Sequence, residues 1–430
     1  MSTELLFHVL LALAVVVIGG RVFGVVVARV GQPPVIGEVL SGILLGPSLL
    51  GAMAPGVEAF LFPDSARPAL GVIAQLGVIL YMFVVGLEFD AASLRRRVAP
   101  YVVISQASIL LPFALGCGLA ALIYRELSQP GVPFVAFAMF MGVAMSITAF
   151  PVLARILTDR GLSRTELGTA ALTCAAVDDV TAWCLLAATV GVARATLSDA
   201  FLVIALTVVF IAAMVLIVRP IAVRLLAPAG AEGDRAQGAV TWTLAALLVS
   251  AVIAEVIGIH AIFGAFLFGA IVPAGSHVAR QLRDHRTPVV TILFLPAFFA
   301  VTGLRTEIGL LASWRDWGIC LLIIVLATAG KFGGTFVAAR LTGMPKTIAA
   351  RLGILMNTRG LMELVVLNVG LDLGVISPRL FTMMVIMAIV TTAMTAPLLD
   401  LVAEQRGEQK QDAEGDADAR ANRDRDSLAG

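Results

Sequence analysis

The sequence predicts an all-α membrane protein that crosses the bilayer about thirteen times. Its 430 residues are 59% hydrophobic and only 14% charged, and the mean hydropathy is +0.98. A soluble globular domain carries about 25% charged residues. Apolar stretches of about 20 residues, the length that crosses a bilayer, alternate with short polar breaks along most of the chain. These observations together predict a bundle of membrane helices.

The predicted spans lie near residues 5–28, 35–51, 69–90, 99–123, 133–157, 165–191, 198–222, 237–258, 260–274, 288–305, 317–340, 347–370 and 379–402. The second and ninth are short. Lys and Arg gather after the odd-numbered spans, and cytoplasmic loops collect these residues. We therefore expect a multi-pass protein of the plasma (inner) membrane, with the amino terminus outside and the carboxyl terminus in the cytoplasm.

The two ends of the chain read differently. The first apolar run, 5–27, lacks a basic leader and a small-residue cleavage site, so it predicts a retained span. Residues 403–430 are charged and nearly free of large apolar side chains, which predicts a disordered cytoplasmic tail. The net charge of +1 gives no reason to expect nucleic acid as a partner.

The fifth span contains Pro151, which lacks an N–H group and disturbs the preceding helix turn near Ile147 and Thr148. The carbonyls that this frees lie at about mid-membrane, where unpaired backbone groups are costly. They must be satisfied by hydroxyls such as those of Ser146 and Thr148, by water, or by an ion. The span therefore predicts an interrupted helix.

The sixth span carries two adjacent aspartates, Asp178 and Asp179, in the middle of an apolar run. Each such carboxylate costs about 2.5–3.5 kcal/mol at the centre of a membrane helix, so the pair predicts an ion or proton site. Adjacent helix residues point about 100° apart. The two carboxylates can therefore face different partners. The alternative interpretation is a polar pair that faces a water-filled vestibule.

The eleventh span contains Lys331, one of only three lysines in the chain. Lysine can lose its proton when it is buried, whereas arginine effectively cannot. A mid-span lysine therefore suits a group that alternately holds and releases an aspartate. A structural counter-ion that never releases its proton is the alternative.

The twelfth span has a second interruption, where Asn357 and Gly360 weaken the helix. Arg359 and Glu363 stand four residues apart, on one helix face, and can pair. We expect this pair to hold the interruption together. Transporters built from inverted repeats have interrupted helices in corresponding positions of their two halves, and here spans four to six would correspond to spans eleven to thirteen.

Six runs together resemble the second group of monovalent cation:proton antiporters, which includes bacterial Na⁺(K⁺)/H⁺ antiporters and plant cation/H⁺ exchangers. They are residues 32–47, 83–88, 146–155, 259–269, 298–303 and 357–363. The resemblance covers nearly everything from about residue 5 to residue 402, in order. Each run alone is a weak signal, but the six together are specific.

The resemblance implies one transmembrane antiporter domain, 1–402, with an inverted-repeat fold and two crossed discontinuous helices. Its parts would be a scaffold near 5–90 and 237–305, an ion-translocating core near 99–191 and 317–402, and a linker helix near 198–222. The scaffold of such proteins is often dimeric, so a homodimer is expected. Spans five and twelve would be the crossed pair, and span six would bring the aspartates to their crossing.

The resemblance also implies a role for each candidate residue. Asp179 would alternately bind the cation and a proton, with Thr148 and Ser146 beside it, and Asp178 would pair with Lys331. The broken helices would be supported by Pro151, Arg359 and Glu363. The potassium efflux branch commonly has glutamine in place of the first aspartate and an appended nucleotide-binding domain; neither feature is present here.

The predicted function is secondary active exchange of K⁺ or Na⁺ for H⁺ by alternating access, with H⁺, the cation and the lipid bilayer as partners. The main alternative is a cation channel or gated leak, for which a carbonyl filter loop would be expected. A membrane enzyme would need a nucleophile or metal constellation, and the scattered histidines and cysteines form none. We therefore expect no catalytic residues, metal site or cofactor. The choice between Na⁺ and K⁺ and the stoichiometry stay open.

Overall fold

The computed structural model describes residues 3–88, 98–162, 165–194, 197–226, 234–273, 276–282 and 290–402. These residues form helices joined by turns, without a strand; an isolated bridge joins Ser128 and Ile376. Ten helices in this part of the chain are long and apolar enough to cross a membrane. The all-α membrane fold is confirmed, whereas the count of thirteen spans stays a prediction. The predicted tail 403–430 lies outside the described residues.

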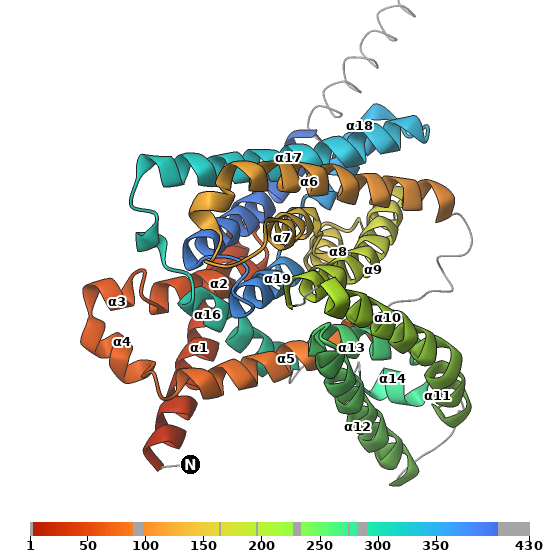
Figure 1. The fold of residues 1–430 in the computed structure, drawn as a ribbon, viewed down its shortest axis with the longest axis horizontal. Helices are drawn as coiled ribbons and strands as arrows, with labels where there is room; N and C mark the ends of the chain where they lie inside the picture. The colour runs from red at the N-terminus through yellow and green to blue at the C-terminus, as the bar shows by residue number, and fades with distance from the viewer. Residues whose placement is uncertain are drawn as a thin grey trace, which may run out of the picture.

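One group of helices packs together as a series of neighbouring pairs, in which α5 contacts α1, α13 and α16 (Figure 1). Its members are α1 (Thr3–Arg29), α2 (Pro34–Leu45), α5 (Arg67–Glu88), α12 (Asp234–Ile257), α13 (Ala261–Ile271) and α16 (Leu295–Leu304). Helices α2 and α16 approach closely at Gly42 and Gly303, where a Cβ on Gly303 would lie 2.6 Å from the Gly42 backbone. Small residues at such crossings let membrane helices pack backbone to backbone.

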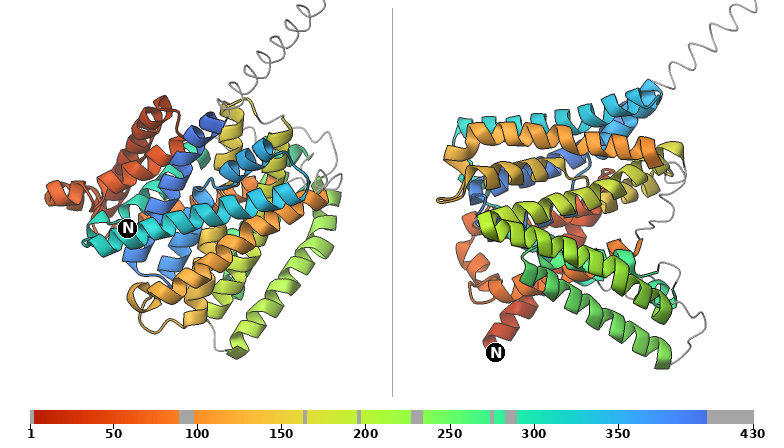
Figure 2. Two further views of the ribbon diagram at one scale, coloured as in Figure 1. Left: turned by 90° about the horizontal axis from the view of Figure 1, so that it is seen from above. Right: turned by 45° about the vertical axis from the view of Figure 1, so that its right-hand side comes forward.

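A second group contains the interrupted helices and the spans that carry Asp178, Asp179 and Lys331. It comprises α6 (Val98–Leu127), α7 (Phe134–Ser146), α8 (Phe150–Asp159), α9 (Glu166–Arg194), α17 (Trp314–Leu341), α18 (Lys346–Met356), α19 (Leu361–Asp372) and a final helix, Pro378–Val402. Helices α6 and α17 lie side by side along one edge of the molecule (Figures 1 and 2). Gly330 permits this contact, because a Cβ there would lie 2.8 Å from Pro112.

Between the two groups runs a continuous helical segment that is not regular α-helix throughout. It consists of α10 (Leu197–Ala213), a π-helical stretch (Met214–Val218) and α11 (Arg219–Leu226). Helix α10 packs against α9 on one side and α12 on the other. This segment matches the predicted span 198–222, although the sequence pattern did not indicate the π-helical stretch.

Several short elements complete the described chain. After α2, which ends at Leu45 instead of continuing to residue 51, come α3 (Leu50–Met53) and α4 (Pro55–Leu61). Gly46 and Pro47 end α2 early, because proline cannot continue the hydrogen-bond pattern. The remaining elements are α14 (His277–Gln281), the π-helical Val290–Phe294 and the 3₁₀ turn Ile308–Leu310.

Both predicted interruptions are present. The first separates α7 from α8 at residues 147–149, and Pro151 lies in the first turn of α8, where no intrahelical N–H bond is lost. The second separates α18 from α19 at residues 357–360. The fold therefore has two discontinuous helices within its second group.

Candidate functional site

The two interruptions meet and are hydrogen-bonded to each other. The backbone N–H of Ala149 donates to the carbonyl oxygen of Thr358 at 2.9 Å. One residue earlier, the hydroxyl of Thr148 lies 3.0 Å from the carbonyl oxygen of Met356. Polar groups of the first interruption thus find partners in the second interruption and at the end of α18, as burial in a membrane requires.

Arg359 ties the second interruption to the end of α7. Its guanidinium donates to the carbonyl oxygens of Ala144 at 2.9 Å and Met145 at 2.5 Å, and to Glu363 Oε2 at 2.8 Å. The side chains of Arg359 and Glu363 are completely buried. Because the carbonyl end of a helix carries partial negative charge, a cation there is stabilising. The predicted pair therefore forms, and Arg359 also caps α7.

Asp178 accepts hydrogen bonds from donors on α6, on α17 and in the first interruption. Lys331 Nζ lies 2.7 Å from Asp178 Oδ2, and both side chains are buried. The hydroxyls of Ser105, Ser108 and Thr148 lie 2.5, 2.9 and 2.9 Å from its carboxylate oxygens. Hydrogen bonds to a charged group are shorter and about twice as strong as those between neutral groups. The predicted ion pair between Asp178 and Lys331 is present.

Asp179 has a different environment. It is only 3% exposed, yet its Oδ1 has no hydrogen-bond partner among the described residues. Asn357, in the second interruption, likewise has a buried side-chain oxygen, Oδ1, that is unpaired within the described chain. A buried acceptor without a partner is costly, and such oxygens are the ligands that a bound cation or a proton would satisfy.

The charges at the crossing do not balance. Two ion pairs, Asp178 with Lys331 and Arg359 with Glu363, are each neutral overall. Lys331 also lies within electrostatic range of Asp179 and Arg359. With every group ionised, the carboxylate of Asp179 is the one charge that these pairs leave uncompensated. A buried unpaired charge is strongly destabilising, so this position favours either a cation or protonation.

The remaining predicted residues occupy the crossing in different ways. Ser146 is buried, and its hydroxyl lies 2.6 Å from the carbonyl oxygen of Gly142 and 3.1 Å from that of Ile109. Its hydrogen bonds therefore run to the backbone of α7 and α6 instead of to the aspartates. Pro151 is the second residue of α8, which begins at Phe150 directly after the first interruption.

Two residues of the site, Ser105 and Ser108, were not anticipated. Both lie on α6, 73 and 70 positions before Asp178, and are completely buried. Their separation of three residues puts both hydroxyls on one helix face. The only signal in the sequence is two serines three residues apart on an otherwise apolar span, which marks a polar helix face but not its partner.

Comparison with known proteins places this arrangement in a family. The model of the sodium/hydrogen exchanger family, transmembrane region, matches residues 9–401. The chain belongs to the sodium/hydrogen exchanger family. It is therefore a membrane transporter and not an enzyme, as the sequence predicted.

The relatives of this chain are named as antiporters of different cations. The chain is 45% identical to the Na⁺/H⁺ antiporter NhaS4 of Synechocystis over 93% of its own length and 98% of the relative's. It is 38% identical to cation/H⁺ antiporter 18 of Arabidopsis thaliana and 35% identical to K⁺/H⁺ antiporter 1 of Saccharomyces cerevisiae. These two matches cover 94% and 86% of this chain, but only 50% and 42% of the relatives.

A solved structure shares the fold. The sodium proton antiporter MjNhaP1 of Methanocaldococcus jannaschii superimposes with a TM-score of 0.67, covering 93% of this chain and 97% of that one. The two sequences are only 12% identical. This similarity confirms that the chain has the antiporter fold. At such low identity it does not assign roles to individual residues.

Proposed function

We propose that this protein exchanges a monovalent cation, K⁺ or Na⁺, for H⁺ by alternating access, with the two ions competing for Asp179. The names of its relatives, a Na⁺/H⁺ antiporter and a K⁺/H⁺ antiporter, support cation:proton antiport as the activity. They differ in the cation, so the choice between Na⁺ and K⁺ is a matter for measurement.

The contrast between the two aspartates supports this assignment most directly. Asp178 is satisfied by an ammonium and three hydroxyls, whereas Asp179 is buried beside it with a carboxylate oxygen that is unpaired in the described chain. One ligand, a cation or a proton, neutralises the remaining charge, and both cannot occupy the carboxylate at once. Such mutual exclusion is the chemical requirement for exchange.

Lys331 would adjust this competition through Asp178. Holding its proton, the ammonium neutralises Asp178 and leaves Asp179 to the transported ions. Its Nζ also lies 3.4 Å from the Ser108 hydroxyl, so the ammonium has a second contact besides the carboxylate. Lysine is a suitable residue for this place because it can release a proton when buried.

The movement that exposes Asp179 alternately to the two faces would be a rigid displacement of the predicted core, 99–191 and 317–402, against the predicted scaffold, 5–90 and 237–305. The hydrogen bonds between the two interruptions support movement of the crossing as one body. We further propose a homodimer in the plasma membrane, with the amino terminus outside.

Purified protein in liposomes containing a pH-sensitive dye tests the proposal. Wild-type protein should give proton flux on addition of K⁺ or Na⁺, and Asp179→Asn should abolish it. Glu166→Gln is the matched control, because Glu166 begins the same helix, α9, on the exposed surface and should retain wild-type flux. Size-exclusion chromatography establishes that each variant is folded. Flux that persists in folded Asp179→Asn protein would overturn the assignment.

Coupling separates exchange from a channel or leak. With the membrane potential clamped, an imposed pH gradient should drive cation movement against its own concentration gradient. Cation flux that only follows its own electrochemical gradient, without any response to the pH gradient, would establish the channel alternative. Repeating the assay with Li⁺, Na⁺, K⁺ and Rb⁺ would then identify the transported ion.

A further inference from the structure

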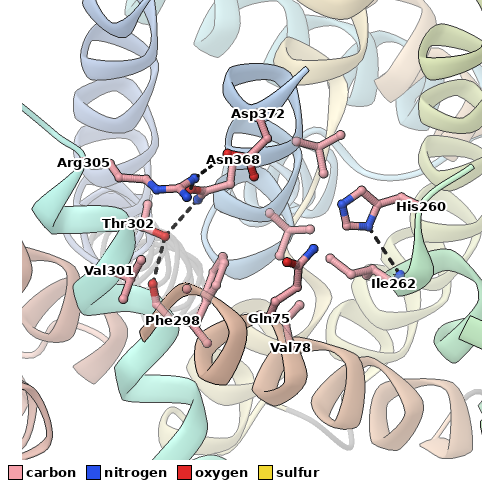
Figure 3. A pocket seen from close by; sticks show the side chains of 14 residues that line it. Gln75, Val78, His260, Ile262, Phe298, Val301, Thr302, Arg305, Asn368 and Asp372 are labelled. Atoms are coloured by element: carbon pink, nitrogen blue, oxygen red, sulfur yellow. Dashed lines mark hydrogen bonds and ion pairs between the residues drawn. The ribbon is translucent and has the colours of Figure 1, made fainter. Parts of the chain in front are cut away.

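A small cavity lies between α19 and the helices α5, α13 and α16 (Figure 3). Its volume is about 50 Å³, and polar side chains of Gln75, Thr302, Arg305, Asn368 and Asp372 line it. A larger cavity of about 520 Å³ adjoins it on the side of α4 and the start of α5. Both cavities are lined by Gly71, Gln75, Val301 and Arg305. Arg305 therefore stands at the boundary between them.

Two oxygens of α19 hold the guanidinium of Arg305 at this boundary. Its Nη1 lies 3.0 Å from Asn368 Oδ1 and 2.8 Å from Asp372 Oδ1. The two acceptors are four residues apart, on one face of α19. Arg305 itself immediately follows α16. The contact thus joins the predicted scaffold to the predicted core.

The amide of Asn368 is fixed in orientation by two further hydrogen bonds. Its Nδ2 donates to the hydroxyl of Thr302 at 2.9 Å (Figure 3). It also donates to the carbonyl oxygen of Leu364 at 2.8 Å. Both of its donor hydrogens are therefore used, and Oδ1 is directed at Arg305. The amide oxygen would remain in place as an acceptor if the guanidinium moved away.

The small cavity leads from Arg305 toward the crossing. Its lining along α19 includes Val365, Asn368, Val369 and Asp372. Helix α19 begins at the second interruption, and Val365 lies in its second turn. A cation that approaches from the larger cavity would therefore pass Arg305 before it follows α19 inward. A fixed positive charge in such a passage opposes cation entry.

We propose that Asn368 and Asp372 form an access site for the transported monovalent cation, and that Arg305 is a tethered cation that occupies this site and closes the route. The proposal rests on the proposed function, because it places the site on the route to Asp179. A carboxylate oxygen and an amide oxygen are suitable ligands for a hard monovalent cation. An arriving ion gains access by replacing the guanidinium.

Partial exposure makes this replacement feasible. The side chains of Arg305 and Asp372 are 37% and 52% exposed. Ion pairs in contact with water contribute only about 0–1 kcal/mol, so the guanidinium is held weakly enough to exchange. In contrast, the buried pair of Lys331 and Asp178 has no such exposure. Of these two contacts, the guanidinium of Arg305 can therefore be replaced by an arriving cation, whereas the buried ammonium of Lys331 cannot.

Transport kinetics of two variants, one that removes a positive charge and one that removes a negative charge, test the proposal. In vesicles of each orientation, the KM for the cation is measured at fixed pH for wild type, Arg305→Gln and Asp372→Asn. Arg305→Gln removes the competitor and should lower the KM about two- to fivefold. Asp372→Asn removes a ligand of the arriving cation and should raise the KM by a similar factor. Both changes should appear when the cation is supplied from one face of the membrane and not from the other.

Arg67→Gln is the matched control, because Arg67 lines the larger cavity only and pairs there with Glu58. It should leave the KM within about twofold of wild type if the effect belongs to the access site. Shifts of the KM in the same direction in Arg305→Gln and Asp372→Asn would show a structural latch and overturn the proposal. Equal shifts from both faces, or no shift in either variant, would overturn it too. Wild-type protein without cation-dependent proton flux would instead refute the proposed function.

Discussion

Arg359 is expected to be the residue whose loss most destabilises the crossing. We consider its replacement by methionine, which keeps an unbranched apolar side chain and removes the charge and every hydrogen-bond donor. In the native protein these donors serve Glu363 and the carbonyl oxygens of Ala144 and Met145. The variant leaves all three acceptors buried in the protein without the guanidinium.

The magnitude follows from these three contacts. Breaking a buried ion pair by removing one partner costs about 3–5 kcal/mol, and an unsatisfied buried carbonyl costs about 1–3 kcal/mol. Protonation of Glu363 limits the first contribution, and relaxation of the end of α7 limits the second. The expected decrease in the free energy of unfolding is therefore about 4 kcal/mol. Adding Glu363→Gln to the variant should recover about 1–3 kcal/mol, because the buried carboxylate is then absent.

Reversible unfolding in mixed micelles, followed by tryptophan fluorescence, measures these differences. The control is Arg315→Met, which removes an equivalent charge from an exposed pair with Glu126 and should cost less than about 1 kcal/mol. If the free energy of unfolding of Arg359→Met lies within about 1 kcal/mol of the wild-type value, the guanidinium does not hold the crossing together and the reasoning is wrong.

Two further predictions concern packing and pairing. Lys331→Met and Asp178→Asn should each be destabilising, and a double-mutant cycle should give a coupling energy of about 1–3 kcal/mol; additive effects would contradict the ion pair. Gly86→Ala should lower the free energy of unfolding by about 1–3 kcal/mol, because its Cβ would collide with the carbonyl oxygen of Phe266 on α13. Gly118→Ala, on α6 with open space around it, should be neutral or stabilising by up to about 1 kcal/mol, and the same unfolding titration compares the two.

Features of the fold that depend on local composition could be predicted from the sequence. The apolar spans are visible because a bilayer requires long apolar helices. Pro151 indicated the first interruption, because proline cannot continue a helix through its interior. The four-residue spacing of Arg359 and Glu363 indicated their pairing, although Arg359 lies in the interruption before α19 and not on the helix itself. The rarity of lysine indicated Lys331, although its partner was inferred by resemblance.

Features that depend on how separate helices pack could not be predicted. Nothing in the periodicity of α6 indicates that Ser105 and Ser108 lie against α9. That contact depends on the close approach of helices, which is set by small residues and side-chain shapes in three dimensions. The bond from Ala149 to Thr358 likewise requires the two interruptions to be at the same depth. The sequence indicated that Arg359 pairs with Glu363, but the contacts of Arg359 with Ala144 and Met145 become apparent only in the assembled bundle.

The hydroxyl of Thr148 has one proton and two acceptors within reach. These are Asp178 Oδ2 at 2.9 Å and the carbonyl oxygen of Met356 at 3.0 Å. It can donate to only one of them at a time. A single hydroxyl in the first interruption thus links Asp178, on α9, to the last residue of α18, at the edge of the second interruption. Loss of that hydroxyl would loosen the attachment of two helices at once, although only one side chain is changed.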